Sequence, residues 1–394
     1  MAQTRWRVLA VLLLARTAMA LQFQSIGSLG PQLVDRLGID YTLLGTLIGL
    51  YMLPGIFMAV AGGLLGQRFG AKPAVLIGLA LMVVGGGVLS GASALWLIAA
   101  GRLIAGAGAV VLNVMLTKMV ADWFSGREIV TAMAILIATW PLGIGLSVTS
   151  AAPLSAAYGW SSVMHVATAA VLAGFALIAM LYRDPPAVAV SESRELAPNM
   201  TRREWLLVTI AGLVWAAYNV AYVVFASFAP AFFASRGYSL TQGSALTGVV
   251  SWSLIASIPI GGYLAERLRM PNLFMVGGLL MSAAATAALA ASGDTAAAFI
   301  AIVLVVGVPA GLIMALPAEA LRPQARAAGM GVFYTLYYGL MAFLPGVAGI
   351  ARDRTASAAA PLLFVALMLL AAALFALLFR GAQRRTISAP AIAR

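Results

Sequence analysis

Two arginines lie inside long apolar stretches of the chain: Arg16 within residues 7–34 and Arg102 within residues 95–119. A charged side chain in such a stretch is costly in hydrocarbon, so it is typical of a site that faces water, a partner or a ligand. All twelve acidic residues lie in polar connections or at the ends of apolar stretches. A cationic site with no internal carboxylate predicts a ligand that brings the negative charge itself.

Small polar side chains share helical faces with both arginines. At 100° per residue, Gln24 and Ser28 fall with Arg16 within an arc of about 120°. Asn113 falls with Arg102 within an arc of about 60°. Amide and hydroxyl groups on these faces are suited to hydrogen-bond a solute. Each arginine also has an interpretation without a ligand: Arg16 could extend toward the nearer membrane surface, and Arg102 could be structural.

Aromatic residues on three further stretches extend the candidate site. Tyrosine and tryptophan combine an apolar ring with one hydrogen-bond donor, and their ring faces attract cations such as arginine. The alternative is that these rings only pack against neighbouring helices or anchor the chain at the membrane interface. The candidate binding set is therefore Arg16, Gln24, Ser28, Arg102, Asn113, Trp140, Trp215, Tyr218, Asn219, Tyr222, Tyr334, Tyr337 and Tyr338.

The composition excludes several other kinds of site. The chain has no cysteine and a single histidine, His165, which rules out disulfides, thiolate chemistry and multi-histidine metal centres. No nucleophile–base pair stands within the apolar stretches, so we expect neither an enzyme nor a bound cofactor or metal. The net charge of +12 is spread over the connections instead of one polar face, which argues against nucleic acid as a partner.

The segments that must position these side chains are long enough to span a membrane. The chain is 63% hydrophobic and 9% charged, with a mean hydropathy of +1.01. A helix of about 20 apolar residues crosses the hydrocarbon core of a lipid bilayer. The pattern predicts an all-α membrane protein with twelve transmembrane helices, at residues 7–34, 42–65, 73–91, 95–119, 129–151, 161–182, 205–234, 241–265, 272–291, 296–319, 328–350 and 358–379.

The chain repeats itself at an offset of 199 residues without a gap. Of the 68 positions in residues 15–82, 15 are identical in residues 214–281, including the pair Arg68 and Arg267. Two similar membrane halves are typical of transporters, in which the substrate site lies at the interface that the halves share. We therefore predict an N-terminal six-helix half at 1–182, a cytoplasmic linker at 183–204, and a C-terminal six-helix half with a short cytoplasmic tail at 205–394.

The connection between the second and third stretches carries the most specific motif. Its sequence, GLLGQRFGAK at residues 63–72, resembles the loop signature of the major facilitator superfamily, and residues 262–269 echo it more weakly. Residues 102–108 and 140–145 resemble the fourth-helix and fifth-helix motifs of the same family. The resemblance implies a major facilitator fold of two pseudo-symmetric halves, in which helices one, four, seven and ten line a central cavity.

The resemblance also implies a latch on the cytoplasmic side. In the family, an acidic residue of the loop motif helps to hold the halves together, but Gln67 stands at that position here and Arg68 follows it. The second copy has Glu266 and Arg267 instead, so we expect the latch to be asymmetric and to depend on Glu266, paired with Arg267 or a basic residue of the opposite half. The alternative is that these charged residues only fix the topology.

Basic residues set the expected orientation. With the N-terminus inside, the cytoplasmic segments carry 18 of the 24 lysines and arginines and the outer loops carry 4, a strong positive-inside bias. We therefore expect a multi-pass protein of the bacterial inner membrane with both termini in the cytoplasm. The first stretch also looks like a cleavable signal, but Arg16 interrupts it and it belongs to the repeat, so we expect it to be retained.

Together these features predict a secondary active or facilitative transporter. Its small-molecule partner would be an anion, either an organic carboxylate or an inorganic oxyanion, carried by rocker-switch alternating access. The chain is similar in its general look to bacterial carriers of the cyanate, nitrate or oxalate type. We expect a monomer, with coupling to a proton or to a counter-anion left open. The alternative is an exporter of neutral or amphipathic compounds, in which Arg16 is structural.

Overall fold

The computed structural model describes residues 2–92, 94–124, 128–184, 200–291 and 296–387, and the regular structure in this part of the chain is helical. Twelve spans are long and apolar enough to cross a membrane, which confirms the predicted number. The first six spans contain α1 (Ala2–Ser28), α3 (Tyr41–Leu50) with α4 (Gly55–Phe69), α5 (Ala71–Ser90), α6 (Leu95–Phe124), α7 (Ile129–Tyr158) and α8 (Trp160–Leu181). The other six contain α9 (Arg202–Ser235), α10 (Leu240–Arg267), α11 (Pro271–Ala291), α12 (Ala296–Val305) with α13 (Ala310–Ala320), α14 (Arg326–Thr355) and α15 (Ala360–Ile387).

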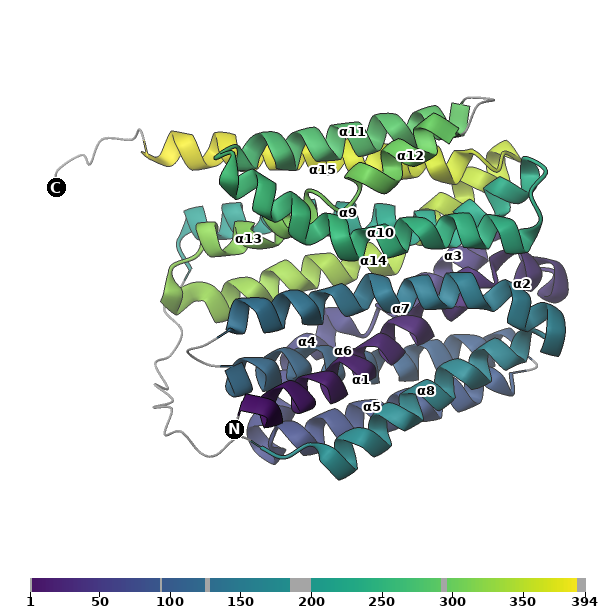
Figure 1. Ribbon diagram of the computed structural model, residues 1–394, viewed down its shortest axis with the longest axis horizontal. Coiled ribbons are helices and arrows are strands. Elements are labelled where there is room, and N and C mark those ends of the chain that lie inside the picture. The colour runs from purple at the N-terminus through teal and green to yellow at the C-terminus, as the bar shows by residue number, and fades with distance from the viewer. Residues whose placement is uncertain (1, 93, 125–127, 185–199, 292–295, 388–394) are drawn as a thin grey trace.

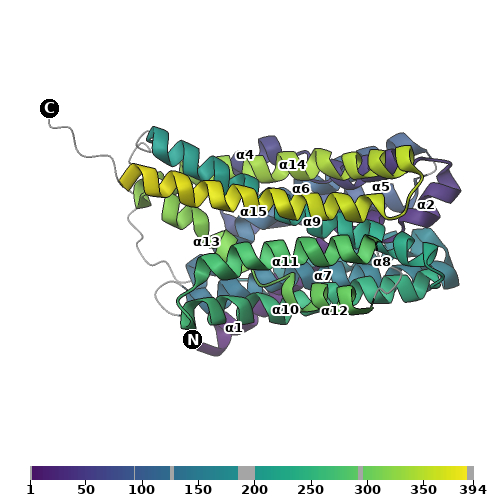
Figure 2. The ribbon, with the colours of Figure 1, turned by 90° about the horizontal axis from the view of Figure 1, so that it is seen from above.

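The helices form two groups that follow the order of the chain. In Figure 1 the first half, purple to teal, lies below most of the second half, which runs on through green to yellow. We call the end of the bundle where α1 begins and α15 ends the terminal side, and the opposite end the far side. Figures 1 and 2 both place the short helix α2 (Gly30–Leu37) at the far side. The spans between the two sides run roughly parallel, as crossings of one bilayer must.

Two spans are broken by a turn, and both turns end at a proline. In the second span, α3 ends at Leu50 and α4 begins directly after Pro54. In the tenth, α12 ends at Val305 and α13 begins directly after Pro309. Proline has no backbone N–H to donate and clashes with the preceding turn, so it starts a helix more readily than it continues one. Each break leaves carbonyl groups at a helix end inside a span, and these need other donors.

Several helix boundaries differ from the prediction, and two of the differences change where a helix starts or ends next to a connection. The first apolar stretch, expected to be one helix over 7–34, ends at Ser28, and α2 begins again with Pro31 in its first turn. Helix α9 begins at Arg202, earlier than the predicted helix at 205–234, behind a capping box of Thr201 and Glu204. Glu204 also bonds Arg322 at 2.8 Å, and this pairing raises the pKa of the Arg322 guanidinium.

The two halves approach each other most closely toward the far side. Helix α3 packs against α14, and α7 packs against α10. At Gly45 and Gly49 of α3, an added Cβ would overlap the carbonyl groups of Pro345 and Ala342 on α14. Only glycine lets the two backbones come this close. The interface is therefore tightly closed on the far side in this structure.

Candidate functional site

Arg16 lies at the interface between the halves. Its Nη1 donates a hydrogen bond to the backbone carbonyl of Leu136 on α7, at 2.5 Å. Its Nε is buried and has no acceptor among the described residues. The guanidinium is within electrostatic range of three tyrosines of the opposite half, Tyr334, Tyr337 and Tyr338 on α14. The side chain as a whole is only half-buried, so one part of it stays accessible.

The three tyrosines form one aromatic group with a tryptophan of α9. The ring centroids of Tyr337 and Tyr338 are 5.0 Å apart, and Tyr334 lies 6.3 Å from each of them. Trp215 lies 6.4 Å from Tyr337. From the first half, Asn113 on α6 donates from Nδ2 to the hydroxyl of Tyr338 at 3.4 Å. The structure thus brings together six candidates from both halves, called the interface cluster below: Arg16, Asn113, Trp215, Tyr334, Tyr337 and Tyr338.

The interface cluster is accessible from the terminal side. Along α14, Tyr338 is 4% and Tyr337 is 8% exposed, whereas Tyr334, one turn nearer the terminal side, is half-buried. Along α6, Asn113 is half-buried and Thr117, one turn nearer the terminal side, is exposed. Exposure therefore rises in the same direction on both sides of the interface. The cluster lies where the closed part of the interface ends.

Gln24 and Ser28 lie beyond the cluster, in the closed part. Gln24 donates from Nε2 to the hydroxyl of Ser227 on α9 at 3.1 Å, across the halves. Ser28 and Ser147 on α7 share a hydrogen bond of 3.1 Å within the first half. Gln24 and Ser28 are 1% and 2% exposed. In this state both residues seal the far side and do not reach the accessible part of the interface.

Arg102 makes its hydrogen bonds within the first half. It is 1% exposed and donates to backbone carbonyls of two helices: on α3, Nε to Leu47 at 3.0 Å and Nη2 to Ile48 at 2.9 Å, and on α1, Nη1 to Phe23 at 2.9 Å. The guanidinium also lies over the ring of Tyr51, 4.6 Å from its centroid. Leu47 and Ile48 are in the last turn of α3, where carbonyls have no helical donor. The broken second span thus explains why a buried cation is needed here.

Trp140 flanks the cluster on α7, one turn beyond Leu136. Its ring stacks on Phe23 of α1 with centroids 5.1 Å apart. Its indole Nε1 is buried and, like Nε of Arg16, finds no acceptor among the described residues. Two buried N–H donors on adjacent helices are therefore without acceptors close to the interface. Such donors are costly unless something else accepts from them.

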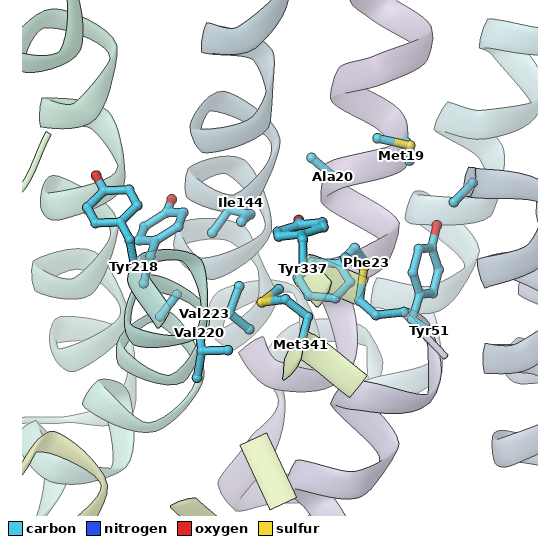
Figure 3. Packing of buried hydrophobic residues seen from close by; sticks show 14 of the residues in the cluster. Met19, Ala20, Phe23, Tyr51, Ile144, Tyr218, Val220, Val223, Tyr337 and Met341 are labelled. Atoms are coloured by element: carbon cyan, nitrogen blue, oxygen red, sulfur yellow. The ribbon is translucent and has the colours of Figure 1, made fainter. Parts of the chain in front are cut away.

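Three candidates of α9 lie outside the cluster or at its edge, where Tyr218 stacks on Trp215 with ring centroids 6.1 Å apart. The hydroxyl of Tyr218 donates to the carbonyl of Val306 on the connection between α12 and α13, at 2.8 Å. Tyr218 and Tyr222 line a small apolar pocket inside the second half, and Figure 3 shows Tyr218 separated from Tyr337 and pointing away from it. Asn219 donates to the carbonyl of Trp215 one turn earlier in its own helix, at 2.8 Å.

The predicted cytoplasmic latch is not engaged among the described residues. Arg68 and Glu266 are exposed, and neither forms an ion pair with a described residue of the opposite half. Arg267 donates from Nη1 to the hydroxyl of Tyr263 in its own helix at 3.1 Å. The side chain of Gln67 lies outside the described residues. Where the chain is described, no group of three acidic or histidine residues is arranged to hold a metal.

Sequence reasoning missed one contact between the halves altogether. On the far side, Asp353 near the end of α14 accepts hydrogen bonds from the start of α3, at Tyr41 and Thr42. In the sequence these residues are 311 positions or more apart. They lie at connections between spans, whose charges predict only the membrane topology. The single local signal is the helix start itself, because Asp40 before Tyr41 is a typical N-cap.

Comparisons with known proteins agree with the fold. The Major Facilitator Superfamily profile matches residues 12–345. The chain is 24% identical over 303 residues to a protein of Cupriavidus necator described as a probable sulfoacetate transporter, covering 71% of this chain and 69% of that one. It is 31% identical over 99 residues to the inner membrane transport protein YajR of Escherichia coli strain K12, a match that spans 25% of this chain and only 21% of that relative.

A solved structure extends the likeness to nearly the whole chain. It is a bacterial homologue of the human lysosomal transporter Spinster, in an inward-facing and unoccupied conformation. The TM-score is 0.78 at 15% sequence identity, and the alignment covers 98% of this chain and 99% of that one. At this level of identity the likeness concerns the fold alone.

Proposed function

Because the chain belongs to the Major Facilitator Superfamily of transporters, we propose that it carries a small anion across the bacterial inner membrane by alternating access. The observation that carries this proposal is Arg16, an accessible cation at the interface whose buried Nε has no acceptor. The indole N–H of Trp140, one turn beyond the Leu136 carbonyl that Arg16 binds, also has no acceptor among the described residues. An anion bound in the interface cluster would provide acceptors for both.

The charge distribution favours an anion over a cation. All twelve acidic residues lie at the ends of spans or in connections, so no carboxylate is placed to compensate Arg16 from within the membrane. Its neighbours across the interface are tyrosines, which leave the positive charge uncompensated. A carboxylate, sulfonate or oxyanion would offer the fork of a guanidinium two acceptors at once. The similarity to a probable sulfoacetate transporter supports an organic anion.

Alternating access would come from rocking of the two halves. We take these as residues 1–182 and 205–394, joined by the linker 183–204. The excess of lysine and arginine on the terminal side supports a cytoplasmic position for that side and for both termini. In this proposal, the open terminal side makes the state inward-facing, and the carrier acts as a monomer. No carboxylate lies away from the span ends to carry a proton on its own, so any coupling would be exchange with a counter-anion or transport of a proton together with the substrate.

Removal of the Arg16 charge tests the proposal. We expect Arg16→Ala to weaken binding of the transported anion about 100-fold, since it removes a charged hydrogen bond in a poorly solvated site. Arg16→Lys should retain part of the affinity, because lysine keeps the charge but not the fork. Thermal-shift titration of the purified protein with carboxylates, sulfonates, nitrate and cyanate would measure both, followed by uptake into liposomes.

Arg7→Ala is the matched control, because Arg7 is an exposed arginine of the same helix. It should leave anion binding unchanged. Anion binding that is equally strong in Arg16→Ala and in the unmodified protein would contradict the proposal.

The second candidate function is export of neutral or amphipathic compounds. The aromatic part of the interface cluster favours it, because Trp215, Tyr334 and Tyr337 offer ring faces to an apolar solute. In that case neutral amphiphiles alone would stabilise the protein, and Arg16→Ala would not change the effect. The same titration therefore separates the two functions.

A further inference from the structure

The contact between α14 and the start of α3 is a helix cap supplied from the opposite half. Oδ2 of Asp353 accepts from the backbone N–H of Thr42 at 2.7 Å and from its hydroxyl at 2.6 Å. Oδ1 accepts from the backbone N–H of Tyr41 at 3.1 Å. Both oxygens of one carboxylate are thus bound to the first turn of α3. Backbone N–H groups in a first turn have no partner within their own helix, and the helix dipole favours a negative charge there.

The cap that α3 supplies for itself does not replace this contact. The side chain of Asp40, the N-cap residue, accepts from the backbone N–H of Leu43, at 2.7 Å. Tyr41 and Thr42 are left for Asp353. When the halves separate on the far side, these N–H groups lose a carboxylate and gain water. The contact therefore favours the closed far side over the open one.

Arg352 adds a second contact between α14 and the first turn of α3. Its guanidinium lies over the ring of Tyr41, 4.1 Å from the centroid, and its Nη2 donates to the Tyr41 hydroxyl at 3.4 Å. A cation over an aromatic ring is attracted by the negative ring face. Neighbouring residues of α14 thus hold the side chain and the backbone of the same residue of α3.

The related contact between α7 and α10 has no such carboxylate. Helix α7 contains no acidic residue in Ile129–Tyr158. The first turn of α10 is capped from within, because Ser239 and Gln242 form a capping box. Among the described residues, the charged contact is therefore found on one side of the pseudo-symmetric interface, and a single substitution can remove it.

We propose that Asp353 is a gating residue that holds the far side closed by capping α3 from the opposite half, with Arg352 in support. It sets the balance between the two access states whatever solute is carried. Asp353 does not touch the interface cluster. Asp353 therefore affects how often the far side opens, and not the contacts between the solute and the interface cluster.

Accessibility of a single cysteine on the far half of the interface tests this proposal. The chain has no cysteine of its own, so Ser251→Cys introduces one thiol. Ser251 is 1% exposed and lies on α10 against Gly145 of α7. In purified protein, Asp353→Ala should raise the rate at which a maleimide labels this thiol about three- to tenfold, as expected for loss of an exposed helix cap. Asp353→Asn, which keeps one acceptor oxygen, should restore part of the slow labelling.

Asp40→Ala is the matched control. It removes the cap of the same helix from within the same half, so it should lower thermal stability without exposing the thiol. Equal labelling in Asp353→Ala and in the parent protein would overturn the proposal, as would an equal increase in Asp40→Ala. Neither outcome depends on which solute is carried or on Arg16, so the test is independent of the proposed anion site.

Discussion

Arg102→Met is expected to destabilise the protein by about 3 kcal/mol, since it leaves several buried carbonyl groups without a donor while the side-chain volume stays similar. The guanidinium binds carbonyls of Phe23, Leu47 and Ile48 and lies over the ring of Tyr51. Methionine can fill the space but cannot donate. The stability of Arg102→Lys should lie between that of the unmodified protein and that of Arg102→Met. A single ammonium cannot bind carbonyls of both α1 and α3 as the planar guanidinium does.

Thermal unfolding of the purified protein, read by tryptophan fluorescence, would measure the loss for Arg102→Met. Arg16→Met is the control, since Arg16 is half-buried and bonds a single described carbonyl. It should cost far less stability. A stable Arg102→Met variant that has lost anion binding would instead make Arg102 a binding residue, as its position in the sequence first suggested.

The fold could be predicted from the sequence because membrane spans depend on local composition. A run of about 20 apolar residues must form a helix in hydrocarbon, where each backbone group needs a partner. The breaks were harder, since a proline inside a span can either end a helix or be accommodated. Pro54 and Pro309 each precede a new helix, whereas Pro141 lies inside the continuous helix α7.

The candidate site could be predicted only in part. Helical phase predicts the direction in which a side chain points, but not the helix that it contacts. Arg16 and the three tyrosines do lie within electrostatic range of one another across the interface. Tyr218 and Tyr222 share the predicted arc with Trp215, yet an arc of about 100° on a buried helix spans contacts with several neighbours. Helix α9 is the most enclosed span, since 83% of the residues in its most apolar stretch are buried. Those two rings therefore pack into the second half, and only Trp215 reaches Tyr337.

The role of Arg102 shows a different limit. Its position within an apolar stretch indicates a charge in need of partners, and a ligand is one solution. The structure provides another, because the break after Leu50 leaves the carbonyls of Leu47 and Ile48 unpaired within α3. Nothing in the sequence near Arg102 indicates that these carbonyls lie against it. A buried cation can thus serve a broken helix as well as a substrate.

Gly49→Leu is expected to prevent closure of the far side and to abolish most transport. The Cα of Gly49 faces the backbone of Ala342 so closely that any Cβ would overlap the carbonyl group. An overlap with backbone cannot be relieved by a rotamer change, so α3 and α14 must move apart at a cost of about 1–3 kcal/mol or more. A shift of that size changes the ratio of the two access states about tenfold to a hundredfold.

Spin labels on opposite halves would show the shift directly. Asp35→Cys on α2 and Thr241→Cys on α10 are exposed positions on the far side of the first and second halves. Gly49→Leu should lengthen the distance between them, and Gly87→Leu should not, because nothing lies within 4 Å of a Cβ at Gly87. An unchanged distance in Gly49→Leu would mean that the glycine contact does not control closure. A longer distance would show that backbone contact at α3 and α14 is required for the closed state, to which the carboxylate of Asp353 then adds a bond that can break on opening.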